Sequence, residues 1–224
     1  MKINSTLFAL FAVLVLSSCH RYYTSSNFAE KSARHRTIAV LPPQMVLTGN
    51  QPRSMSEREI RRLEEKESIL FQQALYNNIL KQSGRKSILT VLVQPYTNTL
   101  ALFEKNNIGI RDAWTMSDDD LAKILGVDAV VRSTIQKDRL MSDLASAGIQ
   151  AGKQILDALV TKPVAVPATT KTADIRATCS IVSNGETLWN DYYKRESNWN
   201  APANEVIENI TNNFAKHFPY IKKA

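Results

Sequence analysis

Cys19 is the residue whose surroundings most clearly indicate a chemical reaction. It follows Lys2 and an unbroken apolar run from Leu7 to Leu16, which spans about 15 Å as a helix, half of a bilayer core about 30 Å thick. Such a run is typical of the hydrophobic region of a signal peptide and not of a membrane span. Ser17 and Ser18 place small side chains at the bond to be cleaved. We therefore predict that the Cys19 thiol takes a lipid through a thioether and that acyl chains anchor the protein.

The string Leu16 to Cys19 resembles the bacterial lipobox, which has a branched apolar residue three positions before the cysteine. The alternative is a plain secretory signal whose cleavage site happens to contain a cysteine. His20 stands where enterobacterial lipoproteins retained in the inner membrane carry Asp, and no acidic cluster follows of the kind that resembles a surface-export signal in Bacteroidetes. By these resemblances we expect a lipid-anchored protein of the outer membrane that faces the periplasm.

The other reactive residue types do not form a catalytic or metal-binding pattern. Cys179 lies in the middle of an apolar strand, which predicts a buried, inert thiol, and lipidation of Cys19 leaves it no disulfide partner within the mature chain. The three histidines, His20, His35 and His217, have no Cys, Asp or Glu at a ligand or triad spacing. We therefore predict a protein that is not an enzyme and that has no catalytic residue, metal or cofactor.

The run Asp118 to Asp120 resembles an acidic metal loop only in its count of carboxylates. It lacks the spaced ligands and the glycine of a calcium loop. At the start of a helix such carboxylates complement the positive end of the helix dipole. We assign them this structural role, and the sequence contains no phosphate loop and no nucleophile elbow.

Composition places the chain among ordinary folded proteins. It has 224 residues, 44% of them hydrophobic, which corresponds to one or two domains, and two cysteines exclude a disulfide scaffold. The formal net charge of +7 falls by one when the signal peptide takes Lys2 away. This basic excess suits an anionic lipid, a glycan or an acidic partner, or is a solvated surface without a specific role. Because the chain is predicted to be exported, we expect no nucleic-acid partner.

Periodicity predicts an α/β domain of a mixed sheet with helices packed on it. Ser56 and Glu59 predict a capping box that begins a long helix, whose charged first half to Glu67 we expect in solvent, with Gly84 as its C-cap. Asn184 and Gly185 predict a tight hairpin turn.

The predicted strands cover 37–41, 88–93, 127–136, 174–182 and 187–196, and the predicted helices cover 57–82, 98–106, 118–125 and a last segment capped by Asn200 or Asn204. We expect a loop from Pro43 to Met55.

Three strings, Ile38 to Pro43, Leu121 to Val131 and Ile181 to Trp189, occur in an order that resembles a known periplasmic domain. The curli secretion channel (CsgG) family, the lipoprotein activators of penicillin-binding proteins and related small envelope lipoproteins share it. The resemblance implies a fold and an envelope setting and carries over no catalytic residue. From the residues themselves we expect Asp128 to bind local backbone at the start of a strand and Trp189 to cover the sheet beside the hairpin.

The segment from Arg139 to Thr172 separates this chain from the channel members. Channel members insert membrane-spanning hairpins, whereas Pro163 and Pro167 suit neither a membrane strand nor a helix interior. Its first part predicts a helix, with the Gly148 and Gly152 spacing that lets helices approach closely. This helix packs either on a partner or against its own sheet. The residues that we predict to contact a partner are Leu140, Leu144, Gly148, Gly152, Ile155 and Leu159.

Together these features predict a signal peptide (1–18), a lipidated Cys19 with a flexible tether (19–36), one periplasmic α/β domain (37–218) with an insertion (139–172), and a short tail (219–224). The predicted function is to bind or scaffold an envelope protein of assembly or secretion, with or without assembly into a homo-oligomer. The alternative is a subunit of a secretion channel ring related to the curli channel. An envelope enzyme would need a polar constellation that the sequence does not contain.

Overall fold

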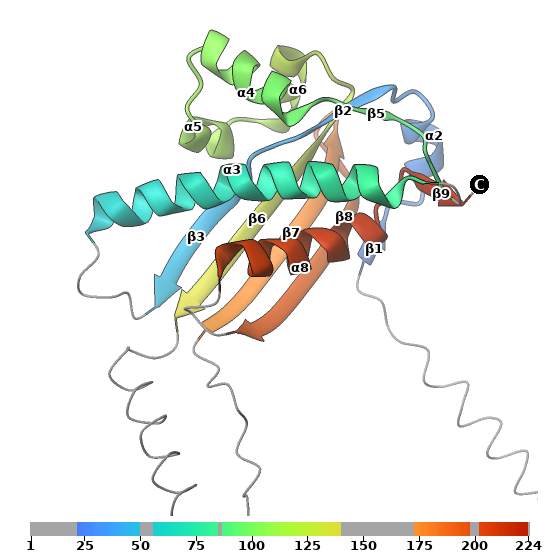
Figure 1. Cartoon of the computed structure of the whole chain (residues 1–224). Helices are drawn as coiled ribbons and strands as arrows, with labels where there is room; N and C mark the ends of the chain where they lie inside the picture. Colours follow the sequence, from blue (N-terminus) through green and yellow to red (C-terminus); the bar gives the residue numbers. More distant parts are fainter. Residues whose placement is uncertain (1–21, 50–55, 85–86, 140–172, 198–201, 224) are drawn as a thin grey trace, which may run out of the picture.

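A mixed β-sheet of seven strands forms the centre of the protein, in a computed structural model that describes residues 22–49, 56–84, 87–139, 173–197 and 202–223 (Figure 1). Its strands are β1 (Tyr22–Thr24), β2 (Thr37–Val40), β3 (Gln44–Gly49), β5 (Leu92–Val93), β6 (Ala129–Arg139), β7 (Ala173–Ser183) and β8 (Glu186–Ser197). They lie in the order β1-β8-β7-β6-β2-β5, and β3 also pairs with β6. β4 (Ser87–Leu89) and β9 (Ile221–Lys223) form a separate small sheet.

The sheet is mixed because β6 has parallel neighbours on one side and an antiparallel neighbour on the other. β2 and β3 run parallel to β6, whereas β7 runs antiparallel to it and β8 antiparallel to β7. Asn184 and Gly185 join β7 to β8 with φ values of 50° and 70°, as the Asn-Gly signal predicts for a two-residue turn. The predicted α/β class with a mixed sheet is confirmed.

β3 is a strand that the sequence did not predict. We expected a loop from Pro43 to Met55, and for Gln44–Gly49 this expectation is wrong, because these residues pair in parallel with β6. Pro42 and Pro43 cannot donate to a ladder, so they interrupt the pairing along β6 without ending it. The chain then resumes with Met45 and Leu47 buried at alternate positions.

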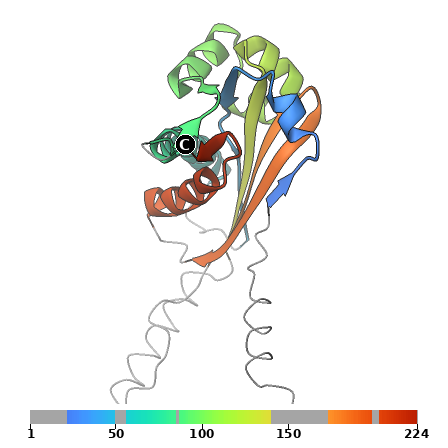
Figure 2. The ribbon, with the colours of Figure 1, turned by 90° about the vertical axis from the view of Figure 1, so that its right-hand side faces the viewer.

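Six helices lie in the part of the chain that the structure describes. They are α2 (Phe28–Ser32), α3 (Glu57–Gln82), α4 (Tyr96–Lys105), α5 (Ile110–Thr115), α6 (Asp118–Leu125) and α8 (Ala203–Lys216). α3 and α8 cover one face of the sheet, and α4, α5 and α6 gather at the end of the sheet where the β7–β8 hairpin turns (Figures 1 and 2). None of these helices is both long and apolar enough to cross a bilayer.

Local capping signals place two helices as expected. The Ser56 hydroxyl accepts from the Glu59 amide at 3.3 Å, and the Glu59 carboxylate accepts from the Ser56 amide at 2.7 Å, which confirms the capping box of α3. α6 begins after Ser117 and ends at Gly126, whose φ of 65° is the left-handed conformation that favours glycine.

The charged first half of α3 is not wholly in solvent, which corrects our expectation. Glu64 and Glu67 are buried, because β3 passes alongside this part of the helix. The Leu47 amide donates to the Glu64 carboxylate at 3.1 Å, and Arg111 of α5 forms an ion pair with the same carboxylate. The unpredicted strand therefore explains the unpredicted burial.

Several element boundaries also differ. The predicted strand over 88–93 is two short strands in different sheets, β4 and β5. α3 ends at Ser83 in an extended conformation, so Gly84 is not its C-cap. α8 begins after Pro202 and not at Asn200 or Asn204. α5 was not predicted, because six residues give too little periodicity to recognise.

The segment from Tyr22 to Arg36, expected as part of a flexible tether, forms β1 and α2 on the side of the domain. The Ser25 amide donates to the Leu188 carbonyl at 2.9 Å, and the Phe28 ring lies 5.5 Å from the Tyr220 ring, centroid to centroid. Lys31 of α2 forms an ion pair with Glu186. These contacts join the chain to the domain from its first described residues.

Two hydrophobic clusters lie on opposite faces of the sheet. The larger one lies under α3 and α8 and includes Phe71, Leu75, Ile79 and Phe214. The smaller one lies under α4 and α6 and includes Phe103, Leu121 and Leu125. Trp189 is fully buried in the larger cluster, with its ring 6.0 Å from Phe218, so it packs beside the hairpin as predicted.

Candidate functional site

The predicted lipidation site and the predicted partner contacts lie outside the described residues. This holds for Cys19 and for the six insertion residues Leu140, Leu144, Gly148, Gly152, Ile155 and Leu159. The insertion nevertheless has a defined origin. Arg139 at the end of β6 and Ala173 at the start of β7 are direct cross-strand partners, so the chain leaves and re-enters the sheet at adjacent positions.

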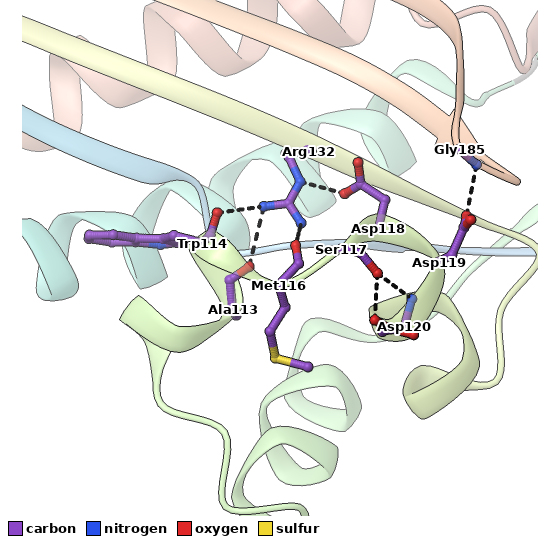
Figure 3. A network of polar contacts seen from close by, with 9 residues as sticks. All are labelled: Ala113, Trp114, Met116, Ser117, Asp118, Asp119, Asp120, Arg132 and Gly185. Carbon is purple, nitrogen blue, oxygen red and sulfur yellow. Dashed lines mark hydrogen bonds and ion pairs between the residues drawn. The ribbon is translucent and has the colours of Figure 1, made fainter.

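The three aspartates at the start of α6 each have a different structural partner (Figure 3). Asp118 forms an ion pair with Arg132 of β6. Asp119 accepts from the Gly185 amide at 2.8 Å and so attaches α6 to the hairpin turn. Asp120 accepts from the Ser117 hydroxyl at 2.7 Å, and its amide donates to that hydroxyl at 3.1 Å. Their carboxylates lie in the first turn of α6, as predicted, and two of them also attach this helix to β6 and to the hairpin, which the sequence did not predict.

Arg132 is the centre of this network, and the sequence did not single it out. Besides Asp118 it donates to three main-chain carbonyls of α5 and the following turn, at 3.0 to 3.3 Å, those of Ala113, Trp114 and Met116. A guanidinium has five donors in a planar fork, and four acceptors here use most of them. The available signal was an arginine directly after the apolar run Ala129 to Val131, because a partly buried charge must find partners on an adjoining element.

Cys179, Asp191 and His217 are brought together by the fold but are not arranged for catalysis. Cys179 and Asp191 are cross-strand partners, and His217 Nδ1 lies 3.0 Å from the Asp191 carboxylate. The predicted burial of Cys179 is confirmed, and burial raises the pKa of its thiol to about 12. A nucleophilic cysteine needs a lowered pKa and access to substrate. The His217–Asp191 pair instead attaches the end of α8 to β8, and sequence spacing could not have revealed it.

A cavity of about 750 Å³ lies between α2, the end of α6 and the β7–β8 hairpin. Its charged lining groups include Lys31 and Glu186, which pair with each other, and Asp119, which holds the hairpin. Asp128 also lines it and accepts from the Arg36 and Thr37 amides at 2.7 and 2.9 Å. The backbone that Asp128 binds is thus that of the neighbouring strand β2 and not the local backbone that we expected.

His35 lies at the edge of this cavity, with its Nδ1 2.6 Å from the Tyr220 hydroxyl. Burial lowers the pKa of His35 and the charge of Asp128 opposes that change. Burial also raises the pKa of Tyr220. Across the described ranges, no group of three or more His, Cys, Asp or Glu side chains could hold a metal ion. Of the ionisable groups around the cavity, Lys31 and Glu186 join α2 to β8, Asp119 joins α6 to the hairpin turn, and Asp128 binds the start of β2.

The lower part of the sheet presents one face that no described helix covers, and we call it the open face (Figure 2). It consists of the residues that alternate with the buried ones along four adjacent strands. In cross-strand register, Thr134, Thr178 and Tyr192 form one row, and Gln136, Arg176 and Lys194 the next. The open face comprises Gln44, Val46, Thr48, Thr134, Gln136, Asp138, Asp174, Arg176, Thr178, Ser180, Asn190, Tyr192, Lys194 and Glu196.

The polar groups of the open face bind one another across the strands. Arg176 forms ion pairs with Asp138 and, at 3.2 Å, with Asp174, which also lies 3.7 Å from Lys194. Asn190 donates to the Ser180 hydroxyl at 2.7 Å. The Arg176 side chain remains 44% exposed and that of Lys194 55% exposed. The open face is therefore polar and of mixed charge, and its side chains are bound to one another across neighbouring strands.

Comparisons with known proteins give structural likeness only. No family model and no curated protein sequence matches the chain. Among solved structures, it is similar to the lipoprotein GNA1162 from Neisseria meningitidis, with 15% identity, a TM-score of 0.41, and 81% of this chain and 98% of that chain covered.

It is also similar to the PelC dodecamer from Paraburkholderia phytofirmans, with 9% identity, a TM-score of 0.38, and 86% and 91% of the two chains covered. The LpoB C-terminal domain from Salmonella enterica shows 9% identity, a TM-score of 0.34 and coverage of 84% and 94%. At these TM-scores the likeness does not establish a shared family or function.

Proposed function

We propose that the protein is a non-enzymatic lipoprotein of the outer membrane that binds or scaffolds another envelope protein on the periplasmic side. Acyl chains on Cys19 would anchor it, as the string Leu16 to Cys19 indicates. The partner would belong to envelope assembly or secretion, in line with the resemblance of three strings to the periplasmic domain of such lipoproteins. No nucleic acid and no cofactor takes part in this proposal.

The open face is the single observation that carries the binding role. The reactive groups around it are held in structural contacts: Cys179 is buried, and Arg132 and Asp191 have partners on neighbouring elements. The open face, in contrast, is an ordered surface of four strands whose side chains reach solvent. A rigid sheet loses little conformational entropy when a partner covers it, which favours binding.

The insertion supplies the second part of the proposed contact surface. It leaves the sheet between β6 and β7, the two central strands of the open face. A partner seated on the open face would therefore lie next to the origin of the predicted contact residues from Leu140 to Leu159. Of the two alternatives for the insertion, we therefore propose that it contacts a partner and does not pack against its own sheet.

Site-specific photocrosslinking of the full lipidated chain in its native envelope tests the proposal. A photoreactive residue at Thr178 on the open face should crosslink to an envelope protein. The matched position is Asn77, which is exposed on α3 on the opposite side of the sheet. No crosslink at Thr178, or equal crosslinks at both positions, would contradict the proposed surface, and a ladder of self-crosslinks would favour the channel-ring alternative.

A second variant tests the insertion without disrupting the sheet. Because Arg139 and Ala173 are direct partners, an Asn-Gly turn can replace residues 140–172 and close β6 and β7 into a hairpin. We expect this variant to fold, as judged by circular dichroism, and to lose the Thr178 crosslink. A folded variant that keeps the crosslink would assign binding to the open face alone.

A further inference from the structure

β1 is paired with only the first half of its neighbour β8, and this register fixes where the chain enters the domain. Tyr22 lies opposite Asp191, and β1 runs antiparallel to β8 (Figure 1). β8 continues to Ser197, six residues beyond that level, which is about 20 Å at the rise of a strand. The chain that precedes Tyr22 therefore enters halfway along β8 and not at the end of the sheet.

The distance from the proposed anchor to this entry point is short. Cys19 precedes Tyr22 by three residues, and three residues of fully extended chain span at most about 11 Å. This reach is about half of the length of β8 beyond Tyr22. If the strands stood along the bilayer normal, Glu196 and Ser197 would lie below the lipid-linked cysteine, and burial of charged side chains in a bilayer is costly.

We infer that the edge of the sheet formed by β1 and the second half of β8 lies against the bilayer surface. This inference rests on the proposed lipidation of Cys19. With the edge on the membrane, the anchor reaches the lipid without strain. Lys194 and Glu196, open-face residues on the edge strand β8, then lie next to the bilayer, whereas the open-face residues of β3, β6 and β7 stand away from it. This part of the open face then remains accessible to a partner in the layer next to the membrane.

The side chains of this edge suit a bilayer surface. Tyr22 is 49% exposed and Tyr23 55% exposed, and tyrosine is enriched at membrane–water interfaces. Tyr22 is also oriented by the domain, because its ring stacks on that of His217 at 6.0 Å. Lys194 and Arg195 are exposed on β8, where Glu196 follows in the chain and the Asp174 carboxylate lies 3.7 Å from Lys194. Exposed cations of this kind are attracted to anionic headgroups.

Fluorescence quenching tests this orientation on the full lipidated chain. The protein is reconstituted in vesicles that contain a phospholipid with a spin label on its headgroup, which quenches a fluorophore that touches the membrane surface. Single cysteines carrying bimane are introduced by Glu196→Cys on the proposed edge and by Leu92→Cys on β5, the opposite edge of the sheet, where Leu92 is 72% exposed. Cys179 does not compete for the label because it is buried. Asn184→Cys reports on the hairpin turn.

We expect strong quenching at Glu196→Cys, and none above the vesicle-free background at Leu92→Cys or Asn184→Cys. A flexible Gly-Ser linker of about ten residues inserted between Arg21 and Tyr22 should remove the difference, because the domain would then turn freely. Equal quenching at both edges, or stronger quenching at Leu92→Cys, in a protein that floats with the vesicles would overturn the orientation alone. Failure of the protein to float would contradict the lipid anchor and the orientation with it.

Discussion

The two faces of the sheet are built from the same strands and differ in what holds them. Along β7, Ile175, Ala177, Cys179 and Ile181 are buried, whereas Asp174, Arg176, Thr178 and Ser180 alternate with them on the open face. The buried face is fixed by close packing against α3 and α8, and the open face by ion pairs and hydrogen bonds in contact with water. The first set of residues therefore specifies the fold, and the second set forms the surface that we propose as a binding site.

The largest difference in stability between variants of the two faces is expected when a buried aromatic ring is removed. Trp189→Ala should lower the free energy of unfolding by about 3–5 kcal/mol, because Trp189 is fully buried and packs on Phe218. Thr178→Ala on the open face should change it by less than about 0.5 kcal/mol. Urea unfolding followed by circular dichroism measures both, and similar losses for the two variants would refute the contrast.

Two arginines on neighbouring strands give the next comparison. Arg132→Ala should cost about 1–3 kcal/mol, because it leaves Asp118 and three carbonyls without their donor. Arg176→Ala, which removes exposed ion pairs, should cost at most about 1 kcal/mol. The same urea titration measures both losses of stability. An Arg176→Ala variant that is less stable than the Arg132→Ala variant would contradict the expected order.

The capping box of α3, a helix that packs on the buried face of the sheet, is itself exposed and gives a smaller effect on stability. Ser56→Ala should destabilise the protein by about 1 kcal/mol, because the Glu59 amide loses its acceptor. Ser56→Asp keeps an acceptor at the same position and should recover most of this loss. Thermal unfolding of the two variants checks this account. If any substitution of Ser56 lowered the stability, both variants would be destabilised alike and the capping explanation would be wrong.

The smallest effect is a pH dependence at the hairpin end. The Thr37 and Arg36 amides hold the pKa of Asp128 below its ordinary value. A carboxylate with a lowered pKa stabilises the fold above its unfolded pKa of about 3.9, and this contribution disappears as the pH falls through the folded value. Asp128→Asn should therefore be less stable than the parent protein at pH 7, and the difference should shrink towards pH 3. A constant difference across this range would show that ionisation of Asp128 contributes nothing.

Elements with a strong local signal were predictable from the sequence. The capping box of α3, the start of α6 with Gly126 as its cap, and the Asn-Gly hairpin depend on residues close together in the chain. β3, β1 and α5 were missed because each is short and is stabilised by partners distant in sequence, such as the pairing of Gln44–Gly49 with β6. The order of the strands follows from the same long-range pairing, which periodicity does not encode.

The same division applies to the candidate site. The burial of Cys179 and the position of the aspartates in the first turn of α6 followed from local pattern, whereas the contacts of Asp118 with Arg132 and of Asp119 with Gly185 did not. The pairing of His217 with Asp191 joins residues from α8 and β8, and the contacts of Arg132 join β6 to α5, so sequence spacing could not show either. The open face could have been inferred from the alternation of polar residues in β6, β7 and β8, but only the register shows that they form one surface.

Mass spectrometry of the mature N-terminus tests the central claim most directly. In protein purified from its native envelope, the account predicts that the first residue is Cys19 and that its peptide carries diacylglycerol and an acyl chain. The Cys19→Ser variant should then leave the membrane fraction. An unmodified Cys19, or a mature chain that begins at another residue, would contradict the lipid anchor on which both the proposed function and the membrane-facing edge depend.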